Sequence, residues 1–304
     1  MKVLFISSGN SESGISPIIK TQGESLKREG IDLSYFTIKE KGVKGYLKSI
    51  LELRENLKSN SYEVVHAHYW LSAIVASLAG AKPIVASLMG DDVKASPYFR
   101  WIIYLFYYLS WSSVIVKSED MYSVLKIKKA HIIPNGVDMS RFRPIDRVLA
   151  LEEVGWDKSK KHILFTSNPK RVEKNFELAK RAFDEIDNDG LELHYLKGIS
   201  HERIPYYYNS SSVVVLTSLW EGSPNAIKEA MACNTPIVST DVGDVKKVIS
   251  KTEGCYLSGF DYEDFALNIK KALNFEDRTS GREDIAYLEI ELIAKKIVDL
   301  YKGI

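Results

Sequence analysis

Short apolar segments alternate with amphipathic segments along the first half of the chain. Four segments have the length and apolar content of buried strands: residues 2–7, 34–38, 63–66 and 83–86. Residues 18–28 show the spacing of an amphipathic helix, and a helical pattern also follows each later strand. Strands that alternate with helices form parallel sheets covered by helices. The pattern therefore predicts an α/β fold that begins with a doubly wound parallel sheet.

The alternation pauses near the middle of the chain and then starts again. A fifth strand, in the string SSVIVKS, is followed by a short helix and then by the turn-forming residues Pro134, Asn135 and Gly136. Five further strands are predicted at residues 162–166, 191–196, 213–216, 236–239 and 255–257. We therefore predict a first domain over residues 1–138, a second over residues 139–281 and a C-terminal helical segment over residues 282–304, with its helix at 282–301.

Composition and charge exclude several other classes of protein. The net charge of +1 argues against a nucleic-acid partner, which normally selects a basic surface. Two cysteines, Cys233 and Cys255, are too few for a disulfide framework or a metal cluster and favour a reducing compartment. Strand-like residues begin at Lys2, so we expect no secretory signal. The best candidate for a membrane span, residues 102–111, is shorter than the ~20 residues required. We therefore expect a cytoplasmic protein.

The most informative segment covers residues 216–244. A loop with Glu221 and Gly222 leads from a strand into a helix, with Ser223 as the expected N-cap and Pro224 in the first turn. Free N–H groups at a helix start, after a glycine that permits close approach, bind phosphate. The carboxylates of Glu221 and Glu229 would repel a bare phosphate but accept hydrogen bonds from sugar hydroxyls. The segment predicts a nucleotide-sugar site, although this order of elements also occurs in α/β proteins without one.

A basic loop follows the first strand of the second domain. Lys170, Arg171 and Lys174 lie between that strand and a helix that starts near Phe176, where a pyrophosphate would sit in a sheet of this type. Guanidinium and ammonium groups both suit phosphate oxygens. A basic surface loop without a ligand is the alternative, and the position beside a strand end favours the ligand role.

The first domain offers weaker candidates. Gly14, in the loop after the first strand, is placed for close approach to a ligand, with an ordinary turn as the alternative. That loop lacks the G-x-G-x-x-G and P-loop patterns, which argues against a dehydrogenase or an NTPase. His66 and His68 share one face of a strand and suggest a metal. No carboxylate or cysteine lies at ligand spacing from them, so a core role is the alternative.

The string EGSPNAIKEA, which begins at Glu221, resembles the signature of the retaining glycosyltransferases of family 4, and IPNGVD resembles their interdomain segment. The resemblance implies the GT-B fold, in which two Rossmann-like doubly wound parallel-sheet domains face each other across a cleft and the last helix returns to the first domain. It also implies that Glu221 faces the transferred sugar and that Glu229 binds the ribose. We add the helix start, Gly222, Ser223, Pro224 and Asn225, to the donor site.

The chain departs from the family pattern at two places. The string MGDD resembles a loop in which a histidine touches the transferred sugar, but Met89 stands at that position and only Asp92 matches. Pro169 occupies the place of the usual arginine, so Arg171 is our substitute for it, with Lys170 as the alternative. The resemblance also implies that residues 197–200 border the nucleotide base.

An aromatic segment, residues 97–113, suggests either a helix packed against the sheet or an interfacial helix at a membrane, where the lysine-rich run 39–48 would assist it. We favour the packed helix.

These observations together predict a retaining glycosyltransferase that moves a sugar from a UDP- or GDP-sugar to a sugar or lipid-linked acceptor, in bacterial cell-envelope polysaccharide synthesis. Arg171 and Lys174 would stabilise the leaving diphosphate, with Glu221 and Asp92 near the sugar. We expect neither a cofactor nor a metal, because an Asp-x-Asp-type metal site is not evident. A nucleotide-sugar 2-epimerase and a non-catalytic nucleotide-sugar-binding subunit remain alternatives.

Overall fold

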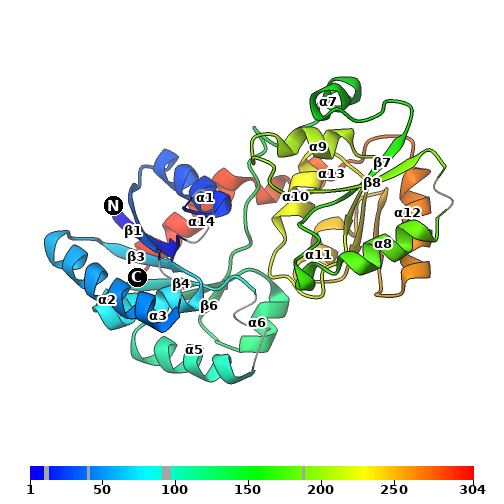
Figure 1. Ribbon diagram of the computed structural model, residues 1–304. Coiled ribbons are helices and arrows are strands. Elements are labelled where there is room, and N and C mark those ends of the chain that lie inside the picture. The colour runs from blue at the N-terminus through cyan, green and yellow to red at the C-terminus, as the bar shows by residue number, and fades with distance from the viewer. Residues whose placement is uncertain (10–13, 40–41, 91–96, 187–188) are drawn as a thin grey trace. The chain divides into compact units, whose positions relative to one another are not determined.

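The computed structural model describes residues 1–9, 14–39, 42–90, 97–186 and 189–304 (Figure 1). The chain forms two compact units. The first consists of Met1–Gly136 and Ile290–Ile304, and the second of Val137–Glu289.

The first unit is built on a six-stranded sheet in which every pair is parallel. The strand order is β2-β1-β3-β4-β5-β6. The strands are β1 (Lys2–Ser8), β2 (Asp32–Ile38), β3 (Val64–His68), β4 (Ile84–Ser87), β5 (Ser113–Val116) and β6 (Ala130–Ile132). The order reverses beside β1, as the doubly wound prediction requires.

Helices cover both faces of this sheet. Helices α1 and α14 lie on one face, and α2, α3 and α5 lie on the other (Figure 1). The helices of the unit are α1 (Pro17–Arg28), α2 (Gly42–Ser59), α3 (Trp70–Ala79), α5 (Pro97–Leu109), α6 (Glu119–Leu125) and α14 (Ile290–Lys302). An ion pair of 2.7 Å joins Arg28 to Glu291, and a Cβ on Gly136 would lie 2.8 Å from the Cα of Ile290. The glycine of the IPNGVD string is therefore required by close packing against α14.

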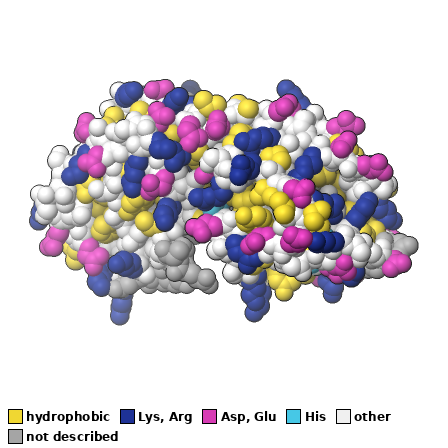
Figure 2. All heavy atoms as spheres, turned by 90° about the horizontal axis from the view of Figure 1, so that it is seen from above, with side chains coloured by type: hydrophobic (Ala, Val, Ile, Leu, Met, Phe, Trp, Pro, Cys, Tyr) yellow, Lys and Arg dark blue, Asp and Glu magenta, His cyan; other side chains and the backbone are white. Residues whose placement is uncertain are grey.

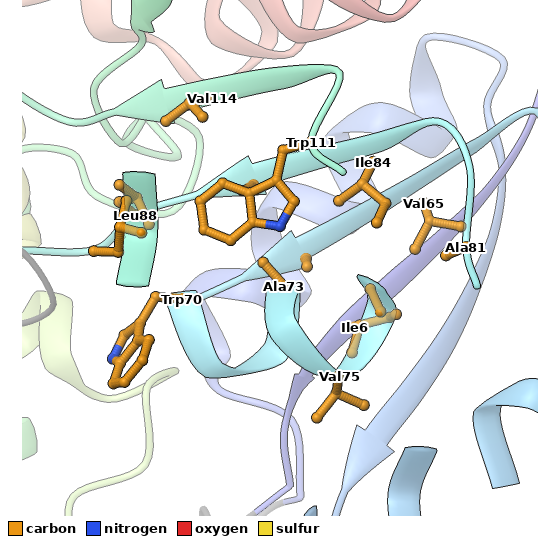
Figure 3. Close-up of a cluster of buried hydrophobic side chains, with 14 of the residues drawn as sticks. Ile6, Val65, Trp70, Ala73, Val75, Ala81, Ile84, Leu88, Trp111 and Val114 are labelled. Carbon is orange, nitrogen blue, oxygen red and sulfur yellow. The ribbon is translucent and has the colours of Figure 1, made fainter. Parts of the chain in front are cut away.

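The core between the sheet and the α2, α3 and α5 layer is apolar. Ile6, Val65 and Ile84, from three neighbouring strands, belong to one apolar cluster with Trp70 and Trp111 (Figure 3). These strand residues alternate with residues that face α1 and α14, which is the period of two expected for a sheet buried on both faces. Within the described part of the chain, none of the helices has the length and apolar character that crossing a membrane requires.

The second unit is a five-stranded parallel sheet in the order β11-β10-β9-β7-β8. Its strands are β7 (Lys161–Phe165), β8 (Leu191–Tyr195), β9 (Val213–Leu216), β10 (Ile237–Thr240) and β11 (Cys255–Ser258). Its helices are α7 (Arg147–Val154), η1 (Val172–Lys174), α8 (Phe176–Asp184), α9 (Ile204–Ser210), α10 (Asn225–Ala232), α11 (Val245–Ile249), α12 (Tyr262–Leu273), α13 (Gly281–Asp284) and η2 (Ala286–Leu288). Helices α8 and α12 pack together on one face of the sheet (Figure 1).

The end of the chain differs from the prediction. We predicted one helix over residues 282–301, whereas α13 and η2 belong to the second unit and the last helix begins at Ile290. Glu289 interrupts the helix because its backbone is extended, with φ −53° and ψ 138°, and pairs with Val137. The first boundary lies between Gly136 and Val137, close to the predicted Asp138.

Lysine and arginine side chains are interspersed with aspartate and glutamate over the face of the protein that Figure 2 shows. Among the described residues that this view shows, the basic side chains do not form a continuous stripe.

Candidate functional site

The predicted donor residues lie in two loops at the carboxyl ends of β7 and β9, which are neighbours in the sheet. Backbone hydrogen bonds hold the loops together. The N–H of Leu219 donates to the carbonyl of Glu173 at 2.9 Å, and the hydroxyl of Thr217 is 2.9 Å from the carbonyl oxygens of Lys174 and Asn175. The basic loop and the acidic loop therefore form one structural feature.

The structure brings Lys174 and Glu221 into direct contact. The Nζ atom of Lys174 donates to Oε1 of Glu221, and the hydroxyl of Ser218 donates to the same oxygen at 2.7 Å. Only 16% of the Lys174 side chain and 14% of the Glu221 side chain are exposed. Because water screens this pair only in part, the attraction exceeds that of an ordinary surface ion pair.

Arg171 and Lys170 are more exposed than Lys174. The guanidinium of Arg171 pairs with Oε1 of Glu173 at 2.7 Å, and 53% of its side chain is exposed. Lys170 is also exposed, and its backbone N–H donates to the side chain of Asn168. Both cations lie in the predicted loop, but the contact with Glu221 is made by Lys174.

The helix start differs by one residue from the prediction. Helix α10 begins at Asn225, and Pro224 rather than Ser223 is the N-cap. Ser223 does not cap the helix because its hydroxyl donates to Oδ2 of Asp244 at 2.7 Å and accepts from the ammonium of Lys228. Gly222, Ser223 and Pro224 are buried, and Asn225 is half-buried.

A buried ion pair that was not predicted from the sequence lies beneath this helix start. Nζ of Lys228 lies 3.0 Å from Oδ2 of Asp244, and the Lys228 side chain is fully buried. Burial lowers the pKa of the lysine, and the carboxylate of Asp244 opposes that shift. The sequence does contain a signal for this burial. Lys228 lies in the predicted helix next to Ile227 and two positions before Ala230, and both of these are core residues.

Gly243, in the loop that follows the adjoining strand β10, packs against the loop of Glu221 and Gly222. Its φ of +62° is in the left-handed region, and a Cβ there would lie 2.7 Å from the carbonyl oxygen of Gly222. Only glycine combines that conformation with such close backbone contact. This role of Gly243 was not predicted from the sequence.

Glu229 lies inside α10 and is held by two side chains. The hydroxyl of Tyr208 donates to Oε2 at 2.9 Å, and Nε2 of His201 is 3.4 Å from Oε1. Burial, together with the carboxylate of Glu229, raises the pKa of Tyr208 well above its usual value, so the phenol stays a donor. Eleven per cent of the Glu229 side chain is exposed, and its orientation is fixed.

The remaining candidates belong to the first unit. Gly14 has φ +82°, and a Cβ there would meet nothing within 4 Å, so its conformation alone explains the glycine. Asp92 lies outside the described residues. His66 and His68 are buried and stacked, with ring centroids 4.3 Å apart. Neither belongs to a group of potential metal ligands among the residues that the structure describes.

Two family models match the chain. The model described as Glycosyltransferase Family 4 matches residues 19–141, and the model described as Glycosyl transferases group 1 matches residues 177–287. The chain is a glycosyltransferase of the family 4 type. The predicted family and enzyme class are confirmed.

Relatives of this glycosyltransferase agree with that assignment. An Escherichia coli UDP-Gal:alpha-D-GlcNAc-diphosphoundecaprenol alpha-1,3-galactosyltransferase is 26% identical over 307 residues, which cover 84% of this chain and 79% of the relative. Two solved structures support the predicted GT-B fold with two Rossmann-like domains. Sucrose-phosphate synthase from Thermosynechococcus elongatus has a TM-score of 0.81 at 19% identity, over 99% of this chain and 98% of its own. An Anabaena protein in complex with UDP-glucose has a TM-score of 0.80 at 15% identity, over 100% of each chain.

Proposed function

We propose that this glycosyltransferase transfers a hexose from a UDP-sugar to an acceptor hydroxyl with retention of anomeric configuration. The contact between Lys174 and Glu221 carries the proposal, because it puts a cation and a carboxylate side by side at the strand ends. The E. coli relative is named for a UDP-Gal donor, and the Anabaena structure contains UDP-glucose, so UDP is favoured over the alternative GDP.

Lys174 and Arg171 are assigned to the leaving diphosphate. When a donor binds, the ammonium of Lys174 exchanges its contact with Glu221 for phosphate oxygens, which frees Oε1 of Glu221 for a sugar hydroxyl. Arg171 reaches the diphosphate from its exposed position, and the N–H groups at the start of α10 add partial positive charge. These charges act where negative charge develops, so the transfer is proposed to need no divalent metal or cofactor.

Glu229 is assigned to the ribose. Its carboxylate accepts from the hydroxyl of Tyr208 through Oε2, and Oε1 is the oxygen assigned to a ribose hydroxyl. A carboxylate already fixed by Tyr208 loses little side-chain entropy when it binds, which favours affinity. This role concerns binding rather than chemistry.

The acceptor is proposed to be attached to a lipid carrier at the cytoplasmic face of a membrane. The E. coli relative is named for a diphosphoundecaprenol acceptor. Helix α5 buries Ile103 in the core, as expected for a helix packed against the sheet. The same helix has four exposed apolar side chains, with exposed fractions of 50% for Trp101, 44% for Leu105, 80% for Tyr108 and 73% for Leu109. These four residues recur at helical spacing and form a second apolar face. Such a face, with aromatic residues, suits the boundary of a lipid layer. Synthesis of a bacterial cell-envelope polysaccharide is the corresponding role.

Calorimetric titration of the purified chain with UDP and with GDP tests the donor assignment. We expect the chain to bind UDP more tightly than GDP. A panel of UDP-sugars with a lipid-diphosphate sugar acceptor then tests transfer, and NMR of the product reports the anomeric configuration. An inverted product would overturn the retaining mechanism. A changed donor formed without acceptor would indicate an epimerase, and binding without turnover would indicate a non-catalytic subunit.

A further inference from the structure

Two strands of the second unit bring together two histidines and a glutamate that the transfer site does not use. Strand β8 is the edge of the sheet and pairs in parallel with β7. Glu192 lies opposite His162 in this register, and His194 lies two residues further along β8. Because side chains alternate along a strand, Glu192 and His194 point to the same face.

Three ligand atoms in this cluster form a compact triangle. Nδ1 of His162 is 3.0 Å from Nε2 of His194 and 3.7 Å from Oε2 of Glu192. Nε2 of His194 is 3.4 Å from Oε2 of Glu192. Ligand atoms about 2.0–2.1 Å from a tetrahedral zinc ion are roughly 3.3 Å from one another. The triangle therefore already has nearly the dimensions of one face of such a site.

The surrounding residues orient both imidazole rings. Nε2 of His162 lies 2.8 Å from the carbonyl oxygen of Asp157, which can only accept, so Nε2 carries the proton and Nδ1 presents a lone pair. Metal-binding histidines usually donate their second N–H in this way. The indole of Trp156 stacks on the ring of His194 with centroids 3.7 Å apart. Both rings are therefore held in position before an ion binds.

The second carboxylate oxygen of Glu192 and the exposure of the site also suit a cation. The ammonium of Lys160 binds Oε1 of Glu192 at 2.6 Å, which leaves Oε2 toward the histidines, and its side chain is 38% exposed. The His162 side chain is buried, whereas 22% of His194 and 32% of Glu192 are exposed, so an ion can enter from their side.

We infer that His162, Glu192 and His194 bind a divalent transition-metal ion, with zinc the best match, that links the edge strand β8 to β7. Two imidazoles and a carboxylate are a common zinc ligand set, and water completes the shell on the exposed side. The ion has a structural role. His162 and Glu192 lie near the starts of β7 and β8, and none of the three ligands belongs to the donor loops that follow β7 and β9. An ion that binds only the folded chain stabilises it.

Metal titration of the full chain tests this inference. Chelator-treated protein at pH 7 is titrated with zinc chloride by calorimetry and with cobalt chloride by visible spectroscopy. We expect one ion per chain, the visible spectrum of four-coordinate cobalt, and a Tm increase of roughly 5 °C or more at a free zinc concentration of 100 Kd. The metal-free protein should bind UDP as well as the loaded protein does, because none of the three ligands is assigned to the donor.

Two variants at partly exposed ligands make the test specific. His194→Gln and Glu192→Gln should each weaken zinc binding by at least about tenfold, since even changes outside the ligand shell have effects of that size. His131→Gln, at an exposed histidine of β6, is the matched control and should leave zinc binding unchanged. The inference is overturned if the chain binds no zinc saturably, or if both ligand variants bind zinc as the unaltered chain does. The two histidines would then form only their mutual hydrogen bond.

Discussion

Lys174 and Glu221 are 47 positions apart in the sequence, and the ammonium of one donates to the carboxylate of the other. The contact forms because β7 and β9 are adjacent parallel strands, so the loops that follow them meet at one edge of the sheet. Ser218 fixes the same oxygen of Glu221 at 2.7 Å. A cation and a carboxylate held together in this way can separate to contact a diphosphate and a sugar, and this exchange underlies the first two predictions.

Replacing Lys174 with alanine should reduce catalysis strongly. The variant loses a positive charge that stabilises the leaving diphosphate, so we expect kcat/KM to fall by about 10²–10³-fold, or roughly 3–4 kcal/mol. Steady-state release of UDP from a UDP-sugar in the presence of acceptor measures the effect. Lys180→Ala, at an exposed lysine of α8, is the matched control. A loss of less than about threefold for Lys174→Ala would contradict the assigned role.

Glu221→Gln should separate turnover from nucleotide binding. The amide keeps the size of the side chain and can still accept from Ser218, but it has no charge. We expect kcat to fall at least tenfold while the Kd for UDP stays unchanged or falls, because the carboxylate is assigned to the sugar and competes with phosphate for Lys174. Calorimetry with UDP and initial rates with a UDP-sugar provide both numbers. If UDP affinity fell as much as kcat, Glu221 would have to be assigned to nucleotide binding instead of to the sugar.

Glu229→Ala should mainly weaken nucleotide binding. A lost hydrogen bond to a charged group corresponds to about 1.5–3 kcal/mol, so we expect the Kd for UDP to rise roughly 10–100-fold. Tyr208→Phe removes only the hydroxyl that orients this carboxylate and should have a smaller effect in the same direction. Unchanged UDP affinity in Glu229→Ala would show that the ribose assignment is wrong.

Lys228→Met should destabilise the second unit. The substitution leaves Asp244 buried without the ammonium that lies 3.0 Å from it, and breaking a buried pair in this way costs about 3–5 kcal/mol. The double variant Lys228→Met/Asp244→Asn should recover part of that loss because the buried charge is gone. Urea unfolding followed by circular dichroism gives both free energies. Equal stability of the single and double variants would argue against charge as the cause.

Gly243→Ala and Gly155→Ala form a matched pair of backbone tests. Both glycines have a positive φ, +62° and +74°, which costs alanine about 1–2 kcal/mol. A Cβ at position 155 would meet nothing within 4 Å, whereas one at position 243 would lie 2.7 Å from the carbonyl oxygen of Gly222. We expect Gly243→Ala to lose more stability and also UDP binding, and Gly155→Ala to retain UDP binding. Equal behaviour of the two variants would rule out the close contact as a determinant of the site.

Much of the fold could be predicted because its signals are local. Apolar runs and helical spacing identify strands and helices wherever short-range periodicity decides which side chains are buried, and both parallel sheets follow from their alternation. The EGSPNAIKEA string contains both glutamates and the helix start within ten residues, so the sequence alone was enough to select Glu221 and Glu229 as candidates.

The sequence could not determine which distant residues become partners. Whether Ser223 caps α10 depends on Asp244, which comes from the loop after β10, and the role of Lys228 depends on the same carboxylate. Helix α5 has two apolar faces in sequence, and only packing shows that Ile103 is buried while Tyr108 is exposed. His162 and His194 meet only because β7 and β8 pair in one register. Strand order and register bring these groups together, and they arise from contacts across the whole sheet rather than from the neighbours of any one residue.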